Sequence, residues 1–263
     1  MIWALQSNLV RESQVRPFAE ALRSQGVPFV DVAIVPFSDG FVNEPELPDT
    51  NVIPYGSTTL MRIALQRGWT GLFYNDQFQV PVWSIHRSDM LNEDAGFCTA
   101  KEAKHRFQCA SPGHWFVRPT EDFKAFSGTV GTAQELAKLM EGGEGSTFNF
   151  TPDTMVAISE AKDIQCEWRY FIVDGEVITG SLYRGAGESY IKREDDDNEL
   201  RVAQVMADIW LPHPTCVMDV ALTEEGRRVI EFNCLNASGI YDHDVPALVA
   251  SISKSGALTH GLY

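Results

Sequence analysis

The chain has 263 residues, of which 44% are hydrophobic and 22% are charged, and this composition is typical of a globular protein with a sizeable buried core. Its formal net charge of -15 argues against general attraction to nucleic-acid backbones or to anionic membranes. Its five cysteines are scattered and never form a CxxC pair, which argues against a disulfide framework or a zinc site and favours a reducing cytosol.

At the N-terminus, residues 1–14 lack a basic start followed by a long apolar run, so no secretion signal is expected. No stretch of the sequence approaches the roughly 18–20 apolar residues that are needed to span a bilayer. We therefore expect a cytoplasmic protein without membrane partners.

Residues 1–85 are expected to form a small α/β domain. Apolar strand-like runs and helical patterns follow in the order strand, helix, strand, strand, helix, over residues 1–5, 12–25, 27–35, 52–57 and 58–68. Such alternation with short turns favours an open parallel sheet. Gly56 and Ser57, at the head of the last helix, form either a plain N-cap or a site for an anion, since backbone N–H groups point outward there.

The rest of the chain, residues 86–263, is expected to form a second domain. It opens with a connector of one or two helices, one of them capped by Thr99 with Glu102 at the capping-box position. This capped helix is predicted at 99–107, and it is followed by a strand at 114–119, a helix at 133–140 and a strand at 155–158. Two basic residues lie in unexpected places, because Arg118 is inside the first strand and Lys124 follows it between two phenylalanines.

Residues 167–184 predict a hairpin, because Asp174-Gly175 between two runs of alternating apolar residues is a strong turn signal. The register counted from this turn pairs Arg169 with Gly180, Glu167 with Leu182, and Arg184 with Gln165. Glu167, Arg169 and Arg184 are therefore expected to project from one face of the sheet. The polar stretch that follows, 185–199, is expected to be a mobile loop, and a helix is expected at 200–209.

A second hairpin is predicted near the C-terminus, because apolar residues alternate with others on both sides of the polar turn 223–227. Folding about Glu225 sets Asp219 directly across from Glu231, with Asn233 two residues further along the same face. Two facing carboxylates repel each other unless a cation lies between them, and all-oxygen ligands suit Mg²⁺ or Mn²⁺. The hairpin thus predicts a divalent metal site, with a solvated face on which two acids meet as the alternative.

Taken together, these segments predict a polyphosphate site. Positive charge comes from Arg118, Lys124, Arg169 and Arg184. Guanidinium groups bind phosphate bidentately, and Mg²⁺ reaches a nucleotide through one or two carboxylates plus the phosphates. For each basic residue alone, a surface salt bridge is the alternative. The sequence holds no GxxxxGK[ST] loop, no GxGxxG motif and no catalytic grouping of its six histidines, and His243 is expected to be an exposed turn residue.

The order of these motifs resembles the ATP-grasp superfamily. The motifs are FVRP at 116–119, KAFSG at 124–128, EWR at 167–169, Arg184, Asp219, EFN at 231–233 and SGIY at 238–241. The chain is most similar to a small clade, common in phages and bacteria, that is named for two arginines and a lysine. The resemblance covers nearly the whole chain and implies a mixed α/β (α+β) ATP-grasp fold at 86–263, preceded by the small α/β domain, 1–85, that such ligases carry.

The resemblance also implies roles for individual residues. It implies that Mg²⁺ bridging the ATP phosphates is held by Asp219, Glu231 and Asn233. It implies that ATP is bound by Arg118 and Lys124 at the phosphates, by the backbone of Ser159, Glu160, Ala161 and Lys162 at adenine, and by Glu167 and Asn236. It implies that the acyl phosphate or substrate carboxylate is held by Arg169 and Arg184, with Lys124 on a lid. The chain departs from larger members in having arginine at 118 and a very short lid segment.

The function that the resemblance implies is an ATP- and Mg²⁺-dependent ligase, with Mn²⁺ as an alternative metal. Such an enzyme joins a small-molecule or peptide carboxylate to an amine through an acyl phosphate and releases ADP and phosphate. Two other functions stay open, namely an ATP-binding regulatory or scaffold protein without turnover and an ATP-grasp phosphotransferase. A nucleic-acid partner is not expected, and a homodimer is left open.

Overall fold

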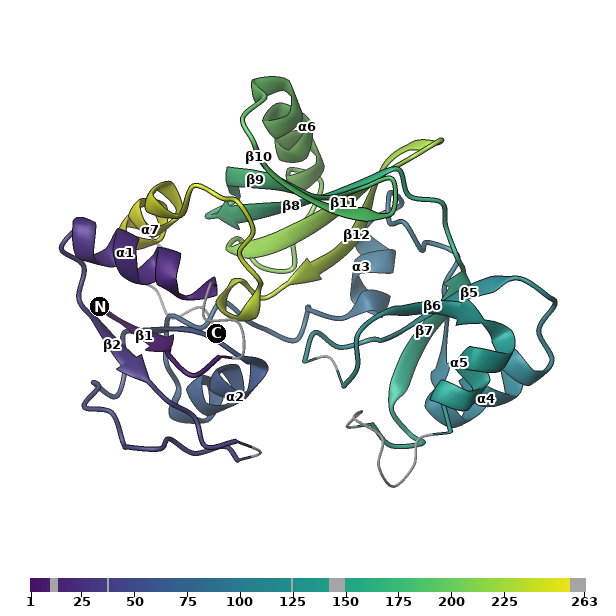
Figure 1. The fold of residues 1–263 in the computed structure, drawn as a ribbon, viewed down its shortest axis with the longest axis horizontal. Coiled ribbons are helices and arrows are strands. Elements are labelled where there is room, and N and C mark those ends of the chain that lie inside the picture. The colour runs from purple at the N-terminus through teal and green to yellow at the C-terminus, as the bar shows by residue number, and fades with distance from the viewer. Residues whose placement is uncertain (10–13, 37, 124, 142–149, 256–263) are drawn as a thin grey trace. The chain divides into compact units, whose positions relative to one another are not determined.

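The structure is a computed structural model that describes residues 1–9, 14–36, 38–123, 125–141 and 150–255 (Figure 1). The chain forms two compact units. Unit 1 comprises Met1–Asn75, Cys166–Val220 and Phe232–Tyr263, and unit 2 comprises Asp76–Gln165 and Ala221–Glu231. The division into 1–85 and 86–263 stays a prediction, because compact units and sequence domains divide a chain by different criteria.

The N-terminal part of unit 1 is a small parallel sheet with helices, as predicted. Its strands are β1 (Ile2–Gln6), β2 (Phe29–Val32) and β3 (Val52–Tyr55), in the order β2-β1-β3. Both neighbours pair with β1 in parallel. Its helices are α1 (Arg16–Ser24) and α2 (Thr58–Arg67). The order strand, helix, strand, strand, helix is the one that the apolar patterns predict.

The head of α2 is an N-cap. The Ser57 side chain accepts a hydrogen bond from the N–H of Leu60, and the helix ends at Gly68, whose φ of 67° lies in the left-handed region. The buried Gln6 side chain also accepts from the N–H and the hydroxyl of Ser57, both at 2.8 Å. Of the two interpretations of Gly56 and Ser57, the structure therefore supports the N-cap, since the Ser57 N–H is already bonded.

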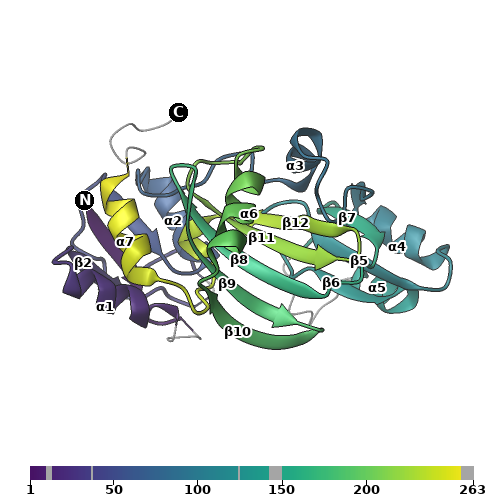
Figure 2. The same cartoon turned by 90° about the horizontal axis from the view of Figure 1, so that it is seen from above.

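A second sheet has five strands in the order β10-β9-β8-β11-β12 (Figure 2). The strands are β8 (Cys166–Val173), β9 (Glu176–Gly185), β10 (Glu188–Glu194), β11 (Cys216–Thr223) and β12 (Gly226–Asn233). The prediction of a loop at 185–199 is wrong, because β10 pairs antiparallel with β9. Most β10 residues are exposed, so an edge strand of this kind lacks the apolar alternation that marks a half-buried strand.

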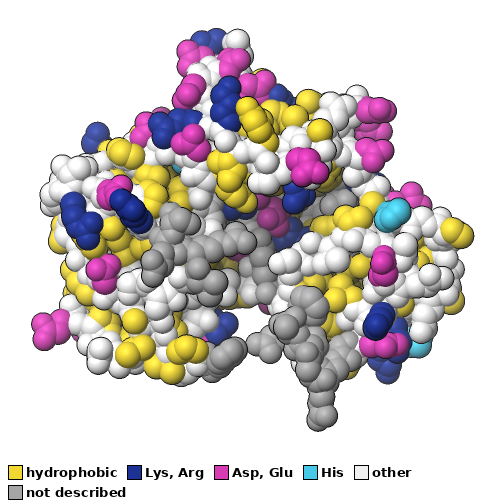
Figure 3. All heavy atoms as spheres, in the orientation of Figure 1, with side chains coloured by type: hydrophobic (Ala, Val, Ile, Leu, Met, Phe, Trp, Pro, Cys, Tyr) yellow, Lys and Arg dark blue, Asp and Glu magenta, His cyan; other side chains and the backbone are white. Residues whose placement is uncertain are grey.

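The remaining helical elements of unit 1 are α6 (Asp197–Ala207), the short helix η2 (Leu235–Ala237) and α7 (Val245–Lys254). Acidic and basic side chains are interspersed over α6, at the top of Figure 3. One apolar cluster of unit 1 joins Trp3 and Phe18 of the N-terminal part to Phe171 of β8 and Leu248 of α7. The N-terminal sheet and the part of the five-stranded sheet that belongs to unit 1 therefore share a core.

Unit 2 is built around an antiparallel sheet of four strands in the order β4-β7-β5-β6. The strands are β4 (Gly96–Thr99), β5 (His114–Pro119), β6 (Thr129–Thr132) and β7 (Met155–Glu160). The helices are α3 (Val80–His86), α4 (Ala100–Gln108) and α5 (Ala133–Leu139). The predicted capping box of Thr99 and Glu102 is confirmed, and Thr132 and Glu135 form another at α5.

The five cysteines are free thiols in the structure. Within the described ranges, no helix combines the length and the apolar character that crossing a membrane requires.

Candidate functional site

Unit 1 holds a buried ion pair between two residues predicted to serve the site. The Arg169 guanidinium donates to both carboxylate oxygens of Asp219, with Nε–Oδ1 and Nη2–Oδ2 distances of 2.8 and 2.7 Å. Arg169 and Asp219 are only 8% and 1% exposed. The amide of Asn233 donates to the same Asp219 carboxylate at 3.4 Å, and Arg169 Nη1 donates to the carbonyl of Gly239 at 3.1 Å. Strands β8, β11 and β12 thus bring three predicted residues together.

Unit 2 holds a second pair of the same kind. Arg118, on β5, lies 2.6 Å from Glu231 on β12, measured between Nη1 and Oε2. Both side chains are largely shielded from water, at 6% and 16% exposure. The guanidinium carbon of Arg118 also lies 5.3 Å from the ring centre of Trp83, a cation–π contact that no sequence pattern indicated. Here too a predicted phosphate-binding arginine is matched to a predicted metal ligand.

The predicted register of the β8–β9 hairpin is wrong beyond the turn. The pairing starts as predicted with Val173 opposite Glu176, but two β-bulges then shift it. As a result Arg169 lies opposite Ser181, and Glu167 lies opposite Arg184. Each bulge adds one residue to β9, and alternation of side chains carries no signal for such an insertion. Glu167 and Arg184 nevertheless share a face, since their side chains form an ion pair of 3.0 Å.

The donor set suits a hard divalent cation. Asp219 offers carboxylate oxygens and Asn233 an amide oxygen, and the Asn233 amide nitrogen already contacts the Asp219 carboxylate. Glu231 lies two residues before Asn233 on β12, so it projects from the same side of that strand. Among the described residues, no group of three His, Cys, Asp or Glu side chains is placed to hold a metal. The expected set of ligands consists of two acids and one amide, so the absence of such a group among the described residues does not test it. That Asp219 faces Glu231 stays a prediction.

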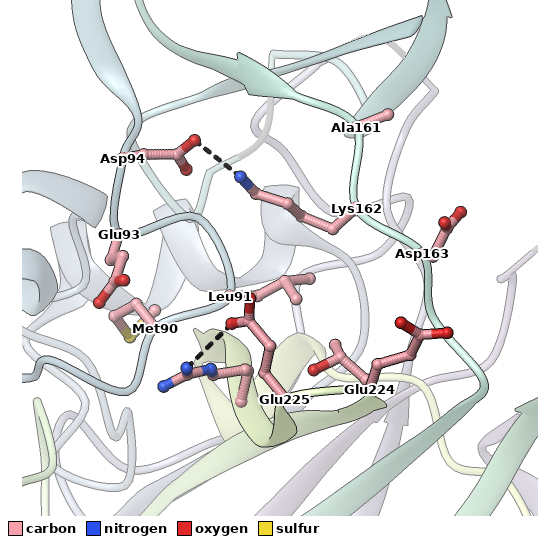
Figure 4. Close-up of a pocket in the computed structure, with 11 residues that line it drawn as sticks. Met90, Leu91, Glu93, Asp94, Ala161, Lys162, Asp163, Glu224 and Glu225 are labelled. Carbon is pink, nitrogen blue, oxygen red and sulfur yellow. Dashed lines mark hydrogen bonds and ion pairs between the residues drawn. The ribbon is translucent and has the colours of Figure 1, made fainter.

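The segment predicted to contact adenine follows β7 in unit 2. Ser159 Oγ donates to Asn92 at 3.0 Å, and Lys162 Nζ lies 2.7 Å from Asp94. Ala161 and Lys162 line a pocket of about 410 Å³ (Figure 4). The other lining residues include several acids and one arginine, namely Glu93, Asp94, Asp163, Glu224, Glu225 and Arg228. Glu160, at the end of β7, is exposed and pairs through its backbone with Trp115 of β5.

Two further predictions have different outcomes. Lys124 lies outside the described residues. His243 is not an exposed turn residue as predicted, because it is only 4% exposed and packs edge-on against Phe171. Burial, followed by the charges of Arg169 and Arg193, lowers the pKa of His243 to about 3, so this imidazole is neutral near pH 7.

The Asn236 side chain is hydrogen-bonded to backbone groups of the protein. Its Nδ2 donates to the carbonyls of Pro54 and Gly71 at 2.7 and 2.9 Å, and its Oδ1 accepts from the N–H of Phe73 at 2.8 Å. The residue is 1% exposed. Because both ends of the amide are bonded to backbone groups, its predicted role near ATP stays a prediction without geometric support.

We expect Asn236→Ala to lower the free energy of unfolding by about 3 kcal/mol, because three buried backbone groups lose their partner and each costs roughly 1–3 kcal/mol when it finds no replacement. Urea unfolding measures the change. Asn43→Ala, at an exposed position, is the matched control and should change stability by less than about 0.5 kcal/mol. Equal stability of the two variants would contradict the assignment.

Two tyrosines of the site were not predicted. Tyr183 bonds Glu167 and stacks on Tyr241, and the guanidinium carbon of Arg169 lies 5.2 Å from the ring centre of Tyr241. In the sequence, Tyr241 is marked only as the last residue of the SGIY motif. No sequence pattern indicates that Tyr183 belongs to the site, because its position depends on a β-bulge.

Comparison with known families and structures gives concordant results. The matching family model describes an ATP-grasp domain, family 3 of the clade named for two arginines and a lysine. It covers residues 69–252, a range that includes all of the predicted site residues. No curated protein sequence matches the chain.

Several solved structures are similar to this chain. D-cycloserine synthetase DcsG is 14% identical, with 98% of this chain and 96% of that chain covered and a TM-score of 0.59. D-alanyl-alanine synthetase A from Vibrio cholerae is also 14% identical, with 98% of both chains covered and a TM-score of 0.59. The ATP-grasp ligase PsnB complexed with minimal precursor is 14% identical, with 98% and 99% covered and a TM-score of 0.51. At such low identity these likenesses show a shared fold.

Proposed function

Since the chain belongs to the ATP-grasp superfamily, in family 3 of the clade named for two arginines and a lysine, we propose that it is an ATP- and Mg²⁺-dependent ligase that joins a carboxylate to an amine. The family match also confirms the predicted superfamily, clade and fold. The similar solved structures include D-cycloserine synthetase, D-alanyl-alanine synthetase and an ATP-grasp ligase complexed with a precursor peptide. Small carboxylates, amines and peptides are therefore the substrate classes to test.

The observation that carries the proposal is the matching of each described phosphate- or substrate-binding arginine to a carboxylate. Arg118 pairs with Glu231, and Arg169 pairs with Asp219. Buried charges are costly unless an opposite charge compensates them. Without ligand, the positive charge of each arginine is balanced by the negative charge of its carboxylate partner. With a nucleotide and its cation, the phosphates would compensate the arginines and the cation would compensate the carboxylates, so the same side chains serve both states.

The chain's own residues would bind and orient the reactants. Arg118 would hold phosphate oxygens of ATP, and Arg169 and Arg184 would hold the substrate carboxylate and the charge that develops on the transferring phosphoryl group. Bound Mg²⁺, held by Asp219, Glu231 and Asn233, would neutralise the phosphates and favour in-line transfer. Positioning and electrostatic stabilisation would then supply most of the catalysis.

In this reaction the substrate carboxylate attacks the γ-phosphorus of ATP, and the bond to ADP breaks. An amine then attacks the acyl carbon, phosphate leaves, and an amide is formed. The protein supplies no covalent nucleophile in this scheme, which agrees with the lack of a catalytic triad in the sequence.

The proposal is tested by incubating the protein with ATP, Mg²⁺ and pooled amino acids and peptides. We expect ADP and phosphate in equal amounts, together with a product whose mass is the sum of two substrates less one water, and no product when EDTA removes the metal. A product that gains a phosphoryl group would instead identify a phosphotransferase. Tight binding of ATP without turnover across the whole panel would identify a regulatory or scaffold protein.

A further inference from the structure

Tyr183 lies at a β-bulge in the middle of the candidate site. Strands β8 and β9 pair Trp168 with Leu182 and Glu167 with Arg184, so Tyr183 is the extra residue between these two pairs. In a regular strand, Tyr183 and Arg184 would point to opposite faces of the sheet. The bulge removes this restriction, and bulges next to active sites commonly redirect a side chain in this way.

The consequence of the bulge is that two neighbouring residues of β9 bond to one carboxylate. The hydroxyl of Tyr183 donates to Oε2 of Glu167 at 2.7 Å, and Nη1 of Arg184 lies 3.0 Å from Oε1 of the same group. Glu167 is only 7% exposed. Both of its oxygens therefore have a fixed donor, and its orientation is set from two sides.

The ring of Tyr183 contacts the other half of the cluster. It stacks on the ring of Tyr241, with centroids 4.9 Å apart and an angle of 13° between the planes. The guanidinium carbon of Arg169 lies 5.9 Å from the centre of the Tyr183 ring, and this guanidinium also holds Asp219. One side chain thus contacts Glu167 with its hydroxyl and Arg169 with its ring.

The phenol is suited to a constant donor role. Burial, followed by the negative charges of Asp219 and Glu167, raises the pKa of Tyr183 above its ordinary value. The hydroxyl therefore keeps its proton at every pH at which an enzyme of this kind would work, and its single O–H is directed at Glu167.

We propose that Tyr183 is a positioning residue of this site, in which the hydroxyl orients Glu167 for nucleotide binding and the ring holds Arg169 for the transfer step. This inference rests on the proposed function, because the two groups that Tyr183 contacts are those assigned to ATP and to the substrate carboxylate. It predicts that the hydroxyl and the ring affect different kinetic constants.

The test uses Y183F and Y183L in the full-length protein, with Y190F as the matched control, since Tyr190 is a tyrosine of the neighbouring strand β10 and is 56% exposed. Y183F should raise KM for ATP and Kd for Mg·ADP about tenfold, which corresponds to about 1.4 kcal/mol, and should leave kcat nearly unchanged. Y183L should show the same change in KM and, in addition, a fall in kcat of roughly tenfold. Y190F should behave as wild type.

Calorimetry with Mg·ADP and thermal unfolding separate the possible outcomes. A purely structural tyrosine would lower Tm without dividing the effect between KM and kcat, and that result would overturn the inference. If the wild-type protein binds Mg·ADP and the Y183F variant binds it equally well, the positioning role of Tyr183 is overturned and the proposed function is not. Wild-type protein that binds no nucleotide would overturn the proposed function and this inference with it.

Discussion

Replacing Glu231 by glutamine is expected to lower Mg²⁺-dependent phosphate release on the order of 10³-fold. The substitution keeps the size of the side chain and removes its charge. It would take away one proposed ligand of the cation and also the partner of Arg118, whose guanidinium lies 2.6 Å from the Glu231 carboxylate. The rate of ADP and phosphate formation, measured with the substrate pair found by screening, gives the change.

The matched control is Glu176→Gln, an exposed acid at the start of β9 in the same five-stranded sheet. It should leave the rate unchanged, because a solvated carboxylate of this kind contributes little to local electrostatics. Titration with Mg²⁺ then identifies the cause of the loss in Glu231→Gln. Partial recovery at high Mg²⁺ or Mn²⁺ indicates a lost ligand, whereas a full rate at ordinary Mg²⁺ would remove Glu231 from the metal site.

The sequence was sufficient wherever local signals decide the structure. The strand at 114–119 has the bounds of β5, because its apolar run is closed by Pro119. Thr99 with Glu102 marks the start of α4, since a capping box needs only residues three apart. Asp174-Gly175 likewise fixes the turn between β8 and β9. Each of these features depends on neighbours in the sequence.

The sequence was insufficient wherever distant segments decide. The bulges of β9 follow from packing, and no alternation pattern indicates the extra residue Tyr183. Strand β10 is polar because it lies at an edge, and polarity alone predicts a loop. For the site, the order of the motifs identified Arg169 and Asp219, but their direct contact joins residues 50 positions apart. The family was therefore predictable, whereas the pairing of charges needed the structure.

The ion pair of Arg169 and Asp219 is expected to dominate the stability of unit 1 when one partner is removed. Arg169→Met and Asp219→Leu should each lower the free energy of unfolding by roughly 3–5 kcal/mol, because each leaves a buried charge without its partner. Removing both charges together should cost several kcal/mol less than the sum of the single changes. Urea unfolding of the four proteins gives the coupling energy.

The control for this cycle is the exposed pair of Arg16 and Glu20 on α1, whose side chains are 81% and 58% exposed. Its coupling energy should be about 0.3–0.5 kcal/mol, the usual value for a helix pair in water. A coupling energy of similar size for Arg169 and Asp219 would contradict the prediction, since the buried pair would then behave as a surface pair.

The double variant also separates stability from function. Replacing a buried ion pair by two apolar side chains of similar volume is often neutral for stability, so the double variant is expected to fold. If the double variant of Arg169 and Asp219 unfolds near the wild-type midpoint and binds Mg·ADP poorly, the charges are kept for the nucleotide and its cation. A double variant with intact nucleotide binding would instead show that the two charges are not needed to bind the nucleotide and its cation.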